Sequence, residues 1–89
     1  MQVNSNTMKY YNKVNENCES AIADDGKGNI FKVKVEFDLL GDVNATSYGW
    51  LDKIGDRYQE STLEVFLELR NIVEGHEQTA LIGTRPTGR

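Results

Sequence analysis

Between Phe31 and Leu39 the sequence alternates between apolar and charged residues, and this pattern constrains the fold more than any other stretch. The apolar positions are Phe31, Val33, Val35, Phe37 and Leu39. Because successive side chains of a β-strand point to opposite faces, such an order gives a strand with one apolar and one charged face. Helical spacing would spread the same five residues around the whole helix. The sequence therefore predicts a strand over residues 30–40, with the rest of the chain covering its apolar face.

The length of 89 residues is enough for one small domain. We expect residues 1–89 to form that single domain, with flexible ends at about 1–7 and 85–89, where the sequence is polar. A chain of this size buries only roughly 60 to 65 per cent of its unfolded surface. A small core is therefore expected, and a large internal cofactor pocket is not.

The segment over residues 8–23 has two interpretations. Its apolar residues have roughly helical spacing, but three asparagines within it are poor helix formers. The glycines and asparagine of residues 24–29 then supply turn chemistry. We favour a hairpin in which a strand ending near Ala23 pairs with the strand over 30–40.

A loop and a helix are expected after Leu40. The composition of residues 41–47 is typical of a loop. Trp50, Ile54 and Tyr58 then follow at intervals of four, which is one face of a helix over about 48–59. Gly55 would weaken that helix by about 1 kcal/mol relative to alanine.

Residues 62–74 fit a second helix better than a strand. Ser61 and Glu64 have the spacing of a capping box, and Gly75 stands where a helix commonly ends. The competing pattern is an alternation of apolar and polar residues, which would make 62–73 a strand. In that alternative the chain is mostly β, with 62–73 and 78–84 as a hairpin. Residues 79–84 are expected to form a last short strand in either case.

These elements together predict an α+β fold: a small antiparallel sheet around strand 30–40, with one or two helices (about 48–59 and 62–74) packed on one face.

The sequence lacks the residue patterns of common catalytic, metal and cofactor sites. Cys18 and His76 are the only residues of their types, and the sequence around Cys18 matches no nucleophile motif. One cysteine and one histidine cannot make a typical structural zinc site. Gly26-Lys27-Gly28 lacks the other residues of a phosphate loop. We therefore expect no enzyme activity, no metal and no cofactor.

Charge is distributed unevenly along the chain. The total is ten basic against fourteen acidic residues, a net charge of −4. Five glutamates stand close together in the C-terminal part, and two arginines follow them near the end. A helix would stack the first three glutamates at i, i+4 and i+8 into an acidic ridge. The candidate partner-binding residues are Glu60, Glu64, Glu68, Glu74, Glu77, Arg85 and Arg89.

The function predicted from these features is protein binding: a small inhibitor or adaptor that meets the basic surface of a larger protein. Small proteins of this description occur among viral antagonists of host enzymes. A self-associating structural subunit, such as a homodimer, is the first alternative. The second alternative is a nucleic-acid-binding accessory protein that uses Lys32, Lys34, Arg85 and Arg89, and the acidic balance argues against it. With one cysteine and no signal peptide or membrane-spanning run, a cytoplasmic location without membrane contact is expected.

Overall fold

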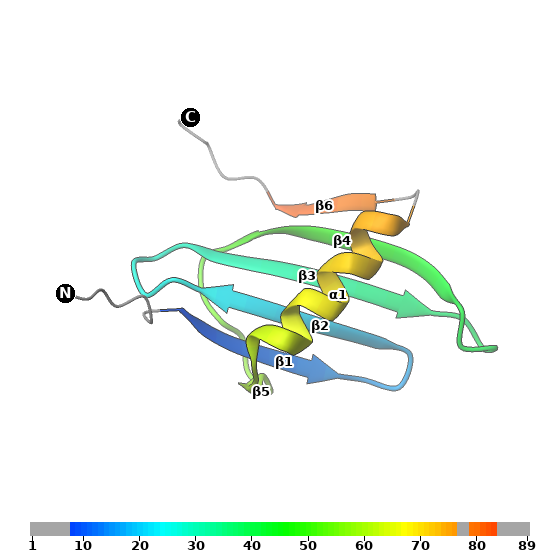
Figure 1. The fold of residues 1–89 in the computed structure, drawn as a ribbon, viewed down its shortest axis with the longest axis horizontal. Coiled ribbons are helices and arrows are strands. Elements are labelled where there is room, and N and C mark those ends of the chain that lie inside the picture. The colour runs from blue at the N-terminus through cyan, green and yellow to red at the C-terminus, as the bar shows by residue number, and fades with distance from the viewer. Residues whose placement is uncertain (1–7, 77–78, 84–89) are drawn as a thin grey trace.

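The computed structural model describes residues 8–76 and 79–83 and contains one sheet with a single helix on one face (Figure 1). The strand order is β5-β1-β2-β3-β4-β6. Neighbouring strands are antiparallel, except that β6 runs parallel to β4. The strands are β1 (Lys9–Val14), β2 (Cys18–Asp24), β3 (Ile30–Phe37), β4 (Val43–Leu51), β5 (Gln59–Glu60) and β6 (Thr79–Gly83), and the helix is α1 (Leu63–Gly75). The prediction of an α+β fold is confirmed.

Strand β3 confirms the alternation seen in the sequence. Val33 and Val35 are buried under the helix, and Phe31 and Phe37 pack against the same core. The strand ends earlier than predicted, at Phe37, where its register with β4 shifts. Leu39 therefore leaves the apolar face and lies in the turn to β4.

The hairpin predicted before β3 is also confirmed. β2 pairs with β3 from Cys18 to Asp24, and β1 adds a second antiparallel neighbour on the other side of β2. Gly26 and Gly28 in the connecting turn have φ of +77° and +96°, conformations that glycine adopts without steric cost. The segment 8–23 therefore belongs to two short strands, and the roughly helical spacing of its apolar residues does not correspond to a helix.

Helix α1 covers the sheet diagonally, from the β1 side towards β4 (Figure 1). Phe66, Leu69 and Val73 form its buried stripe. They pack on Ala21, Ala23, Val33 and Val35 of the two central strands. The helix confirms the prediction for residues 62–74. The alternative hairpin of 62–73 with 78–84 is wrong, because β6 pairs with β4 instead.

The helix predicted over 48–59 does not form, and the predicted loop over 41–47 ends early. Residues 43–51 are strand β4, and the structure has no helix between Leu51 and β5. Pairing with β3 explains the difference: Trp50 lies opposite Phe31, and their rings meet edge to face with centroids 4.9 Å apart. Trp50 and Ile54 have the spacing of one helix face, but Trp50 is part of strand β4, so the two residues do not share a helix.

The connection between β4 and β5 passes across the face of the sheet that the helix leaves open. β4 ends beside β3, whereas β5 pairs with β1, so β2 and β3 lie between the two ends of the connection. Ile22 of β2 points to this second face and is fully buried. The sheet therefore has covered apolar surface on both faces.

The flexible ends predicted at 1–7 and 85–89 lie outside the described residues. Within the described part of the chain, no helix combines the length and the apolar character that crossing a membrane requires.

Candidate protein-binding surface

The outer face of α1 carries Glu64, Glu68 and Asn71, and all three are exposed. Their position follows from the buried stripe: with Phe66, Leu69 and Val73 turned to the sheet, residues on the other side of the helix face water. In the described part of the chain, neither Glu64 nor Glu68 forms an ion pair. Two uncompensated carboxylates thus stand one helical turn apart. We call Glu64 and Glu68 the acidic helix surface.

Glu60 does not extend this surface, so the predicted stack at i, i+4 and i+8 is wrong. Glu60 lies in β5 and pairs with Tyr11 of β1. Paired residues of antiparallel strands share a face, and Tyr11 points away from the helix because its neighbour Tyr10 packs against Phe66. The glutamate side chain is exposed, but it belongs to the other side of the sheet.

Helix α1 begins too late to include Glu60. The backbone N–H of Ser61 donates to the carbonyl of Tyr10 at 2.8 Å, which keeps Ser61 extended beside β1. Thr62 is the N-cap, and its Oγ1 accepts from the N–H of Val65 at 3.3 Å. The helix is therefore capped one residue later than predicted, and the predicted capping box of Ser61 and Glu64 does not form, because the residue three positions after Thr62 is Val65.

The remaining candidate residues are divided between the helix end and the chain end. Glu74 is exposed and lies 3.5 Å from the guanidinium of Arg70, one turn earlier. Its charge is partly balanced, unlike those of Glu64 and Glu68. Glu77, Arg85 and Arg89 lie outside the described residues.

A groove beside Glu74 was not predicted from the sequence. Aromatic and aliphatic side chains of the sheet form its floor, and the Arg70–Glu74 pair lies at its rim. It has a volume of about 340 Å³, and among the described residues it is lined by Phe31, Val33, Tyr48, Arg70, Val73 and Glu74. No local pattern could have indicated this groove, because it exists only where the second half of α1 lies over β3 and β4.

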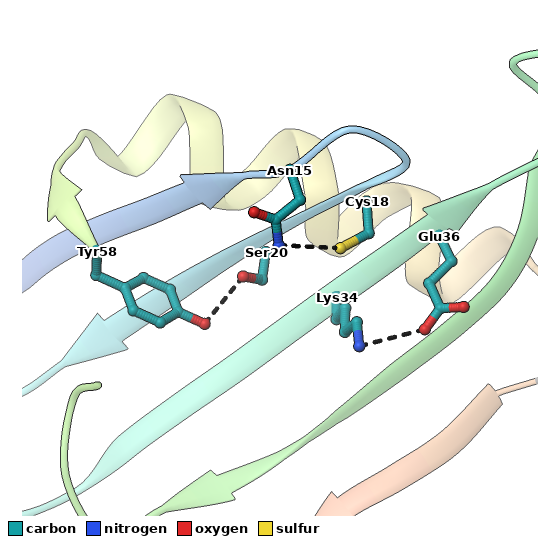
Figure 2. A network of polar contacts seen from close by, with 6 residues as sticks. All are labelled: Asn15, Cys18, Ser20, Lys34, Glu36 and Tyr58. Atoms are coloured by element: carbon teal, nitrogen blue, oxygen red, sulfur yellow. Dashed lines mark hydrogen bonds and ion pairs between the residues drawn. The ribbon is translucent and has the colours of Figure 1, made fainter. Parts of the chain in front are cut away.

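The face of the sheet opposite the helix carries a polar network around Tyr58 (Figure 2). The Tyr58 hydroxyl lies 2.9 Å from Oγ of Ser20 on β2. Two ammonium groups lie over its ring, that of Lys13 at 5.0 Å and that of Lys32 at 5.9 Å from the ring centre. These contacts hold the β4–β5 connection against the sheet.

The same face shows how the lysines proposed for nucleic-acid binding are arranged. Lys32 lies over the Tyr58 ring, and the ammonium of Lys34 lies 3.2 Å from the carboxylate of Glu36 (Figure 2). A phosphate backbone would have to compete with both contacts. The charged face of β3 carries Lys32 and Lys34 followed by Glu36, and it thus does not form a continuous basic track.

Cys18 and His76 do not form a dyad. Cys18 opens β2, is half-buried on the face away from the helix, and lies 3.7 Å from the amide nitrogen of Asn15 (Figure 2). His76 follows α1, on the helix-covered side, and its backbone N–H donates to the carbonyl of Val73. Among residues 8–76 and 79–83, no three His, Cys, Asp or Glu side chains gather in a way that could hold a metal ion.

Comparison of the chain with protein-family models, with curated proteins and with solved structures finds no match. The surfaces described above are therefore the basis for assigning a function.

Proposed function

We propose that the protein is a non-enzymatic protein-binding module, an inhibitor or adaptor that attaches to a larger protein through the acidic helix surface. The observation that carries this proposal is the pair of exposed carboxylates of Glu64 and Glu68 on the outer face of α1, which form no ion pair with another described residue. The complementary partner surface is basic.

The energetics of the helix support this assignment. Like charges at i and i+4 destabilise a helix by about 0.2–0.5 kcal/mol, and a basic group at either position would have avoided the repulsion. A partner that places lysine or arginine side chains against the pair removes the repulsion and adds attraction. Such complementarity mainly accelerates association and selects the partner, so binding should weaken as salt rises.

Self-association is the second candidate, and the edge of β1 supports it. β5 pairs with β1 only at Tyr11 and Asn12, so among the described residues no strand lies beside the outer edge of β1 at Lys13 and Val14. Val14 is also exposed. An open strand edge can pair with another copy of the chain, although a lysine such as Lys13 is a common protection against this.

The test is capture from lysate with tagged protein and two charge-reversal variants. Glu64→Lys/Glu68→Lys changes the acidic helix surface, and Glu16→Lys/Asp52→Lys makes the same net charge change at exposed positions outside the helix. We expect the wild type and the control to capture one protein stoichiometrically and in a salt-sensitive manner. The captured amount should fall by at least about tenfold with the helix variant.

The contrary results are equally specific. Equal loss with both variants would mean that only net charge matters, and unchanged capture with the helix variant would reject the acidic helix surface. Recovery of the bait alone, together with an oligomer in light scattering, would favour self-association instead.

A further inference from the structure

The turn between β3 and β4 displays two adjacent leucines that the fold leaves in water. Leu39 and Leu40 have relative exposures of 103% and 86%. The turn projects from one end of the sheet, clear of α1 (Figure 1). We call Asp38–Asp42 the leucine tip. Single exposed apolar residues are common on protein surfaces, but two consecutive leucines with nearly full exposure at a projecting turn are available to one partner together.

The leucine tip is held in one shape by hydrogen bonds from its own residues. Oδ1 of Asp38 accepts from the N–H of Leu40 at 2.9 Å and from that of Asp42 at 3.0 Å. The backbone of Asp38 bonds to Asp42 at 2.8 Å and to Gly41 at 3.0 Å. Gly41 has a φ of +90°, which closes the turn without steric strain. The leucines are therefore presented by a preorganised turn, and binding would lose little further backbone entropy.

The charge around the leucine tip indicates what it contacts. Asp38 and Asp42 flank the leucines, and no lysine or arginine occurs between Phe37 and Leu51. The next charged side chain along β3, that of Glu36, is paired with Lys34 at 3.2 Å, so the charge of the tip is that of Asp38 and Asp42. A complementary site would be an apolar pocket with basic residues at its edge.

The same charges argue against two other occupants. Anionic lipid headgroups would repel Asp38 and Asp42, and two leucines bury fewer CH₂ groups than the single acyl chain that already binds membranes only marginally. A second copy of the chain, packed leucine to leucine about a two-fold axis, would bring the aspartates of both copies together.

The geometry points to the leucine tip as a second interaction site, which inserts Leu39 and Leu40 into an apolar pocket of a partner protein edged by lysine or arginine. This inference rests on the proposed function only in requiring a protein partner. It does not depend on the acidic helix surface.

The experiment uses the full chain with a photo-crosslinking amino acid at position 40, and at position 52 as a control. Both variants are exposed to lysate, and the crosslinked sites are mapped by mass spectrometry. We expect position 40 to crosslink to one pocket lined by apolar residues and bordered by lysine or arginine, and position 52 not to. A spread of unrelated products from position 40 would overturn the inference.

A substitution pair completes the test. Leu39→Ser/Leu40→Ser should leave the melting temperature unchanged, because both side chains are already exposed. It should weaken capture of the crosslinked protein by at least about tenfold. Met8→Ser, which changes an exposed apolar residue before β1, should not. Unchanged capture with the leucine variant would overturn the inference, and loss with Glu64→Lys/Glu68→Lys alone would leave only the proposed function standing.

Two further measurements address the other occupants. In the first, the wild type is centrifuged with phosphatidylserine–phosphatidylcholine vesicles. In the second, the molar mass of the wild type without vesicles is measured by light scattering. Sedimentation with the vesicles, or a dimer, that disappears in Leu39→Ser/Leu40→Ser would each overturn the assignment to a protein pocket. Neither is expected.

Discussion

The hydroxyl groups of Ser20 and Tyr58 lie 2.9 Å apart, although the residues are 38 positions apart in the sequence. Ser20 is only 3% exposed in the middle of β2, and Tyr58 arrives from the connection that crosses the sheet. The contact gives the buried Ser20 hydroxyl a hydrogen-bond partner and also holds the β4–β5 connection on the sheet. It also explains why a segment without regular structure stays close to the sheet.

The first prediction concerns this contact. Tyr58→Phe keeps the ring beside Lys13 and Lys32 but leaves the Ser20 hydroxyl without its phenol partner, which should lower the free energy of unfolding by about 1–3 kcal/mol. Ser20→Ala should lower it less, because the Tyr58 hydroxyl can turn to water. Urea denaturation of both single variants and the double variant measures the coupling. Strictly additive effects would show that the contact contributes nothing.

The sequence predicted β3 and α1 because each carries its own pattern. In β3, Val33 and Val35 alternate with charged residues, and this pattern indicates a strand without reference to the neighbouring strands. The leucine-rich segment after Thr62 places apolar residues on one face of a helix in the same local way. β4 was misassigned because its pattern is weak in isolation. Its residues alternate between Tyr48 or Trp50 on one face and serine or glycine on the other, and only pairing with Phe31 makes this a strand.

Only the part of the candidate site that lies on α1 could be predicted from the sequence. Glu64 and Glu68 share an exposed face, as their spacing indicates. Glu60 does not, because the extended backbone at Ser61 is fixed by a hydrogen bond to Tyr10, a partner 51 positions away. The groove beside Arg70 and the exposure of Leu39 depend on the assembled fold, so no local pattern reports them.

The second prediction tests where α1 begins. Thr62→Ala removes the side-chain acceptor of the Val65 N–H and should lower the free energy of unfolding by about 1 kcal/mol. Ser61→Ala changes a hydroxyl one residue earlier and should have a smaller effect. Thermal denaturation followed by circular dichroism compares the two. A larger loss for Ser61→Ala would instead support the capping box predicted from Ser61 and Glu64.

The third prediction concerns the core under the helix. Phe66 is 7% exposed and its ring centroid lies 5.9 Å from that of Tyr10, so Phe66→Ala should cost about 3–5 kcal/mol. A chain of this size has only about 4–13 kcal/mol in total, so the variant should be close to unfolding at 37 °C. Leu63→Ala, at a position 48% exposed on the same helix, should change stability far less. Similar midpoints in urea for the two variants would contradict the packing described for α1.

The turn between β2 and β3 contains a carboxylate with a shifted ionisation. The Asn29 amide donates to Asp25 Oδ2 at 2.6 Å and, together with the Lys27 backbone N–H at 2.7 Å, lowers the pKa of Asp25 below its ordinary value of 3.8. Both donors favour the charged carboxylate. The same carboxylate also accepts from the Asn29 backbone N–H at 3.1 Å, so it holds the turn closed.

The fourth prediction follows from this shift. Because the folded state holds the Asp25 proton more weakly than the unfolded state, Asp25 stabilises the fold above pH 3.8, and this contribution is lost as the pH falls through the lowered value. Asn29→Ala removes the strongest donor and should move the pKa of Asp25 back towards 3.8. The carboxyl carbon chemical shift, titrated by NMR, measures the change, and Asn44→Ala on β4 is the matched control. If Asn29→Ala left the Asp25 titration where it is in the wild type, the backbone N–H groups alone would account for the shift and the side-chain contact would be incidental.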